Sequence, residues 1–153
     1  MIAHPQIVHF PIAILIVALI FEVITYFWKK ETFTSASLIL LIIGTAGAFI
    51  SIQTGQTAAD IAKKITGIGS TLHEHEETAE LVFYLYLGIT VVKAGLMYLK
   101  KDILPWRMLI VSAMLVGTFL LYRAAHYGGQ LVYEWGAGVK PILEQYDKQR
   151  TDQ

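Results

Sequence analysis

The sequence predicts an all-α integral membrane protein, a four-helix bundle. Of its 153 residues, 55% are hydrophobic and only 16% are charged, which is too apolar for an ordinary soluble domain of this length. Four apolar stretches can each cross about 30 Å of hydrocarbon, and backbone groups in lipid must pair within their own segment. We therefore expect four helical spans, at Ile7–Trp28, Thr34–Gln53, Leu81–Leu99 and Leu104–Ala125.

The connections between these spans alternate in character. Residues 29–33 and 100–103 are short and basic, which predicts antiparallel neighbours, whereas residues 55–80 are long and polar. The positive-inside rule puts the two basic turns in the cytoplasm and both termini outside. We expect residues 1–140 to form the transmembrane domain and residues 141–153 to be a polar tail.

Short segments next to the spans have sequence patterns that predict where helices begin and end. Ala58–Ile65 is typical of a short amphipathic helix, and Thr71–Glu74 fits a capping box that starts the third helix before its apolar part. Gly128 and Gly129 are expected to end the fourth helix, and Leu131–Val139 suits a short amphipathic segment at the membrane interface.

Five histidines are brought to one membrane face by this topology. His4 and His9 open the first helix, His73 and His75 open the third, and His126 closes the fourth. Placing an ionisable side chain within a membrane costs free energy, so such a residue is interpreted first as functional. Imidazole is also a common ligand of haem iron, zinc and copper. The alternative is that these histidines only bind water and lipid headgroups.

The composition excludes several classes of function. There is no cysteine, so a metal or haem must be held by nitrogen or oxygen, and covalent c-type haem attachment is excluded. The chain has 12 Lys and Arg residues and 12 Asp and Glu residues, so it carries no net positive charge that would favour binding to nucleic acid. No nucleophile motif or phosphate loop supports hydrolysis or phosphoryl transfer.

Two charges lie inside the spans at the same depth. Glu22 and Lys93 are predicted to pair between the first and third helices and fix their register, with a proton path as the alternative. Arg123, one turn before His126, suits either a haem propionate or a lipid phosphate. Small residues at helical spacing predict packing seams, and those near the histidine end would also leave room for a planar macrocycle; they are Gly44, Ala48, Ser51 and Gly55 on the second helix and Gly88 and Gly95 on the third.

The two ends of the chain carry long ordered motifs, HPQIVHFPI at residues 4–12 and GGQLVYEWGAGV at residues 128–139. With them the chain resembles a bacterial four-helix membrane family catalogued as a domain of unknown function. Members are similar to small b-type cytochromes, and some are joined to cytochrome c-like or Rieske-like modules. The resemblance implies electron transfer at the outer face of the bacterial cytoplasmic (inner) membrane. His4 and His9 match the first motif, His126 matches the last together with the Gly128–Gly129 pair that follows it, and His73 and His75 fall in the variable middle of the family.

These observations lead to one main hypothesis, an electron carrier rather than a catalyst, holding one or two b-type haems through its histidines. We expect His9, His75 and His126 as ligands first, then His73, and His4 last because terminal residues are least constrained. Partners would be the lipid bilayer and a quinol or an extracytoplasmic redox protein. The chain could also form a homo-oligomer. Two alternatives stay open: a zinc or copper site that adds Glu74 or Glu77, and a membrane anchor or assembly subunit without a cofactor.

Overall fold

The computed structural model describes residues 4–28, 31–101 and 103–139, and within these ranges its only regular secondary structure is α-helix. The first span consists of α1 (His4–Ile7) and α2 (His9–Phe27), and the others are α3 (Glu31–Ala62), α4 (Gly69–Tyr98) and α5 (Leu104–Tyr133). By length and composition, these make four helices able to cross a membrane, so the predicted four-span fold is confirmed. Lys29, Lys30 and Asp102 of the basic turns, and the tail at 141–153, lie outside the described residues.

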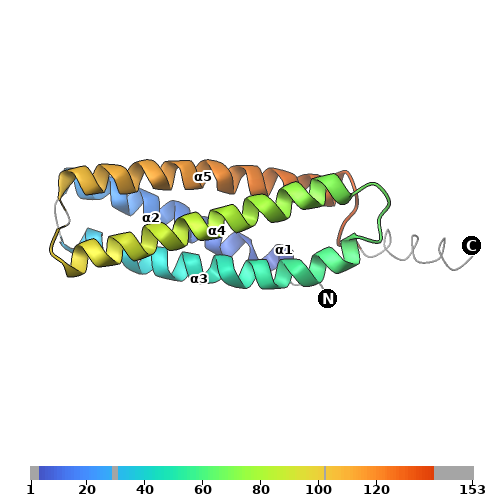
Figure 1. The fold of residues 1–153 in the computed structure, drawn as a ribbon, viewed down its shortest axis with the longest axis horizontal. Helices are drawn as coiled ribbons and strands as arrows, with labels where there is room; N and C mark the ends of the chain where they lie inside the picture. Colours follow the sequence, from blue (N-terminus) through green and yellow to red (C-terminus); the bar gives the residue numbers. More distant parts are fainter. Residues whose placement is uncertain (1–3, 29–30, 102, 140–153) are drawn as a thin grey trace, which may run out of the picture.

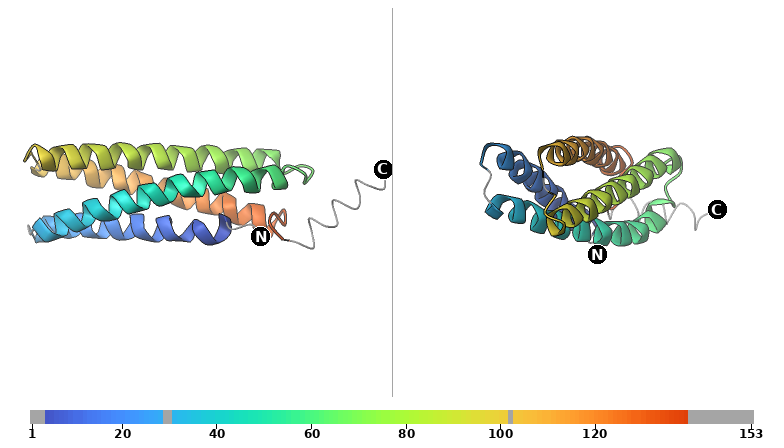
Figure 2. Two further views of the ribbon diagram at one scale, coloured as in Figure 1. Left: turned by 90° about the horizontal axis from the view of Figure 1, so that it is seen from below. Right: turned by 60° about the vertical axis from the view of Figure 1, so that its left-hand side comes forward.

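The helices run up and down along one long axis (Figure 1). α2 packs against α3, and α4 packs against α5, while contacts of α3 with α4 and of α2 with α5 join the two pairs. The beginning of α1, the α3–α4 connection and the end of α5 lie at one end of the bundle (Figures 1 and 2). Following the orientation expected from the sequence, we call this the outer end, and the end with the α4–α5 turn the inner end.

Small residues set how closely the helices approach, although only on one of the two predicted seams. A Cβ built on Gly44 of α3 would lie 2.6 Å from a methyl group of Leu15 on α2, so this seam is confirmed. Gly88 and Gly95 of α4 are exposed and have nothing within 4 Å of a built Cβ. The prediction of a second seam inside the bundle was therefore wrong, because these two glycines lie on the face of α4 that points away from its neighbours.

The predicted ion pair in the membrane interior is confirmed. Lys93 Nζ lies 2.5 Å from Glu22 Oε2, and each side chain is only 1% exposed. The same carboxylate oxygen accepts a hydrogen bond from Ser37 Oγ at 2.7 Å. Burial of two charges in an apolar core is tolerated only when they neutralise and hydrogen-bond each other, so this contact fixes α2, α3 and α4 in one register.

The helices extend farther at the outer end than the sequence predicted. α3 continues to Ala62, so most of Ala58–Ile65 belongs to α3 and not to a separate helix. α4 begins at Gly69 after Ile68, which makes no side-chain capping bond. The capping box at Thr71–Glu74 was therefore a wrong assignment, because those residues already lie inside the helix, although α4 does start before its apolar part as expected.

The fourth span also continues past its predicted end. α5 runs through Gly128 and Gly129 to Tyr133, so the glycine pair does not end the helix. Leu131 and the turn that follows it, including Trp135, pack on a small outer core between the ends of α3, α4 and α5. The outer end is thus closed by an apolar cluster separate from the main core of the bundle. The cluster consists of Ala59, Ala62, Ile65, Ile68, Leu72 and Leu131, with Trp135 and Ala137 against it.

The first span is interrupted where the sequence predicted a kink. α1 ends at Ile7, α2 begins at His9, and Val8 lies between them in a turn. Pro11 has no N–H to donate to the carbonyl of Ile7, so the helical ladder loses one bond here. The interruption leaves α1 as a short separate helix packed on α3.

Candidate functional site

The structure brings together two of the five histidines. All five lie near the outer end of the bundle, but only His4 of α1 and His75 of α4 face each other. Their ring centroids are 6.3 Å apart and their planes are inclined by 80°. Both side chains are half-buried. We call these two residues the imidazole pair.

The ring of His4 is held from α3. Its Nδ1 lies 3.1 Å from Thr54 Oγ1. The hydroxyl of Thr54 lies 3.1 Å from the carbonyls of both Ile50 and Ser51; when it donates to either of them it accepts from His4, and Nδ1 then carries the proton. In a neutral imidazole this leaves Nε2 as the nitrogen with an available lone pair.

The ring of His75 is held in the same manner from α5. Its Nδ1–H donates to the backbone carbonyl of Ala124 at 2.9 Å. A carbonyl only accepts, so this bond fixes the tautomer and again leaves Nε2 with the lone pair. Histidines that bind metals usually donate their other ring nitrogen to a protein oxygen, and both members of the imidazole pair do so.

A glycine lies against each ring of the imidazole pair. A Cβ built on Gly55 of α3 would lie 3.0 Å from His4 Cε1, and one on Gly128 of α5 would lie 3.2 Å from His75 Cε1. Both distances are shorter than ordinary contacts between a Cβ and a carbon atom. Any larger residue at either position would push the ring that it touches, so the two glycines help to set the position of the imidazole pair.

The imidazole pair occupies a polar layer between two apolar regions. On α4, Leu72 on one side of His75 belongs to the outer cluster, and Val82 on the other side belongs to the main core. On α5, Leu121 and Leu131 flank Gly128 in the same way. The two rings are therefore shielded along the bundle axis, which lowers the local dielectric and strengthens their interaction with any ion they bind.

The other three histidines make separate contacts. His9 is exposed and donates from Nδ1 to the carbonyl of Pro5 at 2.6 Å, so the interruption of the first span does not turn it inward. His73 is exposed, with Nε2 3.9 Å from Glu77. His126 is exposed and stacks on Tyr122 of its own helix at a centroid distance of 6.4 Å. None of these contacts involves the imidazole pair.

Arg123 lies on the outer surface of the bundle and contacts protein groups. Its Nη2 donates to the hydroxyl of Tyr127 at 3.1 Å and lies 3.5 Å from Glu74 Oε2. Glu74 is therefore engaged with Arg123, and Glu77 lies next to His73. Among residues 4–28, 31–101 and 103–139, no group of three or more His, Cys, Asp or Glu side chains is placed to hold a metal ion.

Sequence reasoning did not identify two partners of the imidazole pair. Thr54 is one of many threonines in apolar helices, and only its contact with His4 distinguishes it. The acceptor for His75 is a backbone carbonyl, which has no sequence signal at all. Gly128 was considered as a helix breaker and as part of the C-terminal motif, and its contact with His75 explains why a glycine is accommodated within a continuous helix.

Comparison with protein families gives one finding. A family model described as "Predicted membrane protein (DUF2231)" matches residues 2–141, almost the whole chain. Comparison with curated proteins and with solved structures gave no match.

Proposed function

The chain belongs to the DUF2231 family of predicted membrane proteins, and we propose that it is a membrane b-type haem protein whose axial ligands are His4 and His75. The observation that carries this proposal is the geometry of the imidazole pair. Two rings from helices far apart in the sequence face each other at the outer end, each with Nδ1 bound to the protein.

The distance between the rings would allow both imidazoles to bind one metal ion. A metal–imidazole bond is about 2 Å long and a ring centre lies about 1 Å behind its nitrogen, so two such rings have centroids about 6 Å apart. The observed centroid distance is 6.3 Å. Haem iron bound by two histidines needs just these two protein ligands, because the porphyrin supplies four nitrogens.

The number of ligands favours haem over zinc. A structural zinc site takes four protein ligands and a catalytic one takes three. The glutamates considered as additional ligands, Glu74 and Glu77, contact Arg123 and His73 instead of the imidazole pair.

When bound, haem would supply a one-electron couple, and the chain would supply its position and surroundings. Thr54 and the carbonyl of Ala124 orient the rings and make Nε2 of each a better donor. The apolar clusters on both sides limit the access of water. With the basic turns in the cytoplasm, His4 and His75 would hold the haem near the outer face, where a quinol or an extracytoplasmic redox protein could reach it.

The test is a reduced-minus-oxidised absorption spectrum of the full chain purified from membranes of cells supplied with haem. We expect a Soret band that shifts on reduction with dithionite. His4→Ala and His75→Ala should each lose this band or convert it to that of a five-coordinate haem. His9→Ala and His126→Ala are the matched controls, because both rings are exposed at the same end, and they should keep the parent spectrum.

Two results would contradict the proposal. If well-folded parent protein contains no haem after expression with excess haem, the chain is not a haem protein, and a membrane anchor becomes the better description. If haem is present but is lost from His9→Ala or His126→Ala and retained in His4→Ala and His75→Ala, the ligand assignment is wrong.

A further inference from the structure

The short helix α1 carries one member of the imidazole pair and has few contacts with the rest of the bundle. It packs on α3 and α2, and within the described residues its backbone does not approach that of α4 or α5. None of its four residues is buried. The ring of His4 reaches across to α4, where it meets the ring of His75 nearly edge to face. A movement of α1 would therefore leave the packing of α4 on α5 intact.

The break between α1 and α2 has the properties of a hinge. The backbone hydrogen bonds at the break are long, at 3.2 Å from Val8 N to the His4 carbonyl and 3.5 Å from Ile12 N to the Val8 carbonyl. A typical N–H···O bond has a length of about 2.9–3.0 Å. Pro11 has no N–H to donate to the carbonyl of Ile7, so one further bond is missing. The chain can therefore bend here with little loss of hydrogen bonding, as hinges at the ends of helices do.

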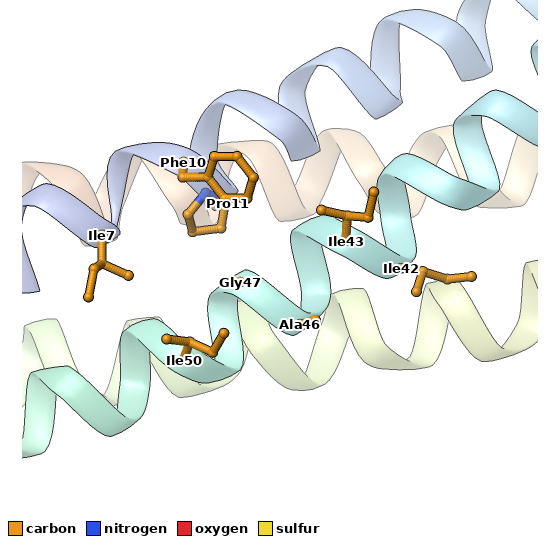
Figure 3. A pocket seen from close by; sticks show the side chains of 8 residues that line it. All are labelled: Ile7, Phe10, Pro11, Ile42, Ile43, Ala46, Gly47 and Ile50. Atoms are coloured by element: carbon orange, nitrogen blue, oxygen red, sulfur yellow. The ribbon is translucent and has the colours of Figure 1, made fainter.

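An apolar groove beside the break leaves the end of α1 loosely packed on α3. The groove lies between the α1–α2 segment and α3 and has a volume of about 480 Å³ (Figure 3). On α2, Pro11 touches α3, because a Cβ built on Gly47 would lie 3.1 Å from it. On α1, Ile7 lies across the groove from Ile50. Close packing therefore holds the start of α2 on α3, and it does not hold the last residue of α1.

The two rings of the imidazole pair differ in how firmly they are held. His75 lies within α4, a helix of 30 residues that contributes to both apolar clusters. His4 lies on a helix of four residues and is held on α3 by its bond to Thr54 and by the contact of its ring with Gly55. A macrocycle, which is far wider than an imidazole, can enter between two facing rings only after one of them withdraws. The ring that is free to withdraw is that of His4.

We infer that α1 is a hinged arm, which bends at Val8, carries His4 away from His75 to admit a planar ligand and then returns. The identity of the ligand as haem rests on the proposed function, whereas the movement itself does not. Opening breaks the bond between His4 and Thr54, which joins two neutral groups, and one contact between rings. The closed arm therefore predominates in the ligand-free protein, and the open arm is a minor state.

The first test measures this movement in haem-free protein by electron paramagnetic resonance. The chain has no cysteine, so nitroxide labels can be attached at Gln6→Cys on α1 and Glu80→Cys on α4, both of which replace exposed residues. We expect a main distance and a minor, longer one from the open arm. Thr54→Val should raise the ratio of open to closed arm about fivefold, which corresponds to the loss of one hydrogen bond. The matched pair of Gln56→Cys on α3 with Glu80→Cys should give one distance.

The second test locks the arm in its closed position. Ile7→Cys and Ile50→Cys, joined by a short bis-maleimide across the groove, tie α1 to α3. Hemin should bind to this linked chain at least about tenfold more slowly than to the same variant without the linker, because the open state is no longer populated. Phe10→Cys with Ile43→Cys is the matched control, since its linker spans the same groove but holds α2 and leaves the arm free (Figure 3). Hemin should bind to the control at the same rate with and without the linker.

Two results would overturn the inference. One is a single distance, or the continuous spread that a frayed chain end would give, in both the parent and folded Thr54→Val. The other is an equal rate of hemin binding with and without the linker between Ile7→Cys and Ile50→Cys, once circular dichroism shows folded protein and mass spectrometry shows complete linkage. Two resolved distances in a parent that binds no haem would refute the proposed function alone. Haem bound at an unchanged rate by the locked chain would refute this inference alone.

Discussion

The two polar sites inside this bundle differ in whether their side chains keep an atom that is able to bind a ligand. Near the inner end, Glu22 receives hydrogen bonds from Lys93 and Ser37, and the opposite charges neutralise each other. At the outer end, His4 and His75 each use one ring nitrogen to bond to the protein and turn toward each other. At the inner site the chain itself neutralises both charges, although Oε1 of Glu22 is buried without a hydrogen-bond partner, while each imidazole retains a nitrogen able to bind a further group.

This difference separates a structural role from a binding role. A buried ion pair holds helices in register and offers little to a ligand, because its charges are already compensated. A pair of oriented neutral imidazoles contributes less to holding the fold but has the donor atoms that a metal requires. Mutations at the inner site should therefore change stability, and mutations at the outer site should change haem affinity.

The largest expected effect comes from breaking the inner ion pair. Glu22→Ala leaves the ammonium of Lys93 buried without a partner, which costs about 3–5 kcal/mol of unfolding free energy. The double variant Glu22→Leu with Lys93→Met removes both charges and should recover most of this loss. Unfolding of the purified protein in a denaturing detergent measures both. A single variant as stable as the parent would show that the ion pair does not hold the bundle.

The next effect is on the orientation of His4. Thr54→Val keeps the shape of the side chain but removes the acceptor of the His4 Nδ1–H bond, and loss of such a supporting bond lowers metal affinity by about 10–100-fold. Titration of the haem-free protein with hemin measures the change. Thr45→Val is the control, because Thr45 bonds to Thr90 in the interior and its loss should leave haem affinity unchanged. Equal affinities in parent and Thr54→Val would refute the positioning role.

A smaller effect is expected at the glycine that touches His75. Gly128→Ala places a methyl group 3.2 Å from the ring, and overpacking of this kind costs at the lower end of about 1–3 kcal/mol, which corresponds to a loss of haem affinity of about fivefold. Gly129→Ala is a closely matched control, because its Cβ would meet nothing within 4 Å. If both alanine variants bind haem alike, the contact with His75 has no part in the site.

The smallest effect is predicted for Arg123. Its contacts with Glu74 and Tyr127 are on the surface, where ion pairs contribute little. Arg123→Gln should leave both the stability and the haem affinity within error of the parent in the same titrations. A several-fold loss of haem affinity would instead indicate that Arg123 binds a propionate, and the haem would then have to reach the surface of α5.

The sequence predicted those features that depend on position along a helix. Span length follows from hydropathy, and the pairing of Glu22 with Lys93 follows from their equal depth in two spans. The meeting of His4 with His75 depends on rotation of the helices about their axes and on the break between α1 and α2 at Val8, which no periodicity encodes. His4 was ranked last because it lies near the chain end, but α1 is anchored on α3 by Thr54. The helix ends were also underestimated, because an outer apolar cluster, and not lipid, supports the last turns of α3 and α5.

The most direct test of the account is the haem content of a chain that retains only the imidazole pair. The triple variant His9→Ala, His73→Ala and His126→Ala removes all three exposed histidines and leaves His4 and His75. Pyridine haemochrome quantification should give one haem per chain in this variant, with the same reduced-minus-oxidised spectrum as the parent. Loss of haem from the folded triple variant would contradict the central claim, because it would place an axial ligand outside the imidazole pair.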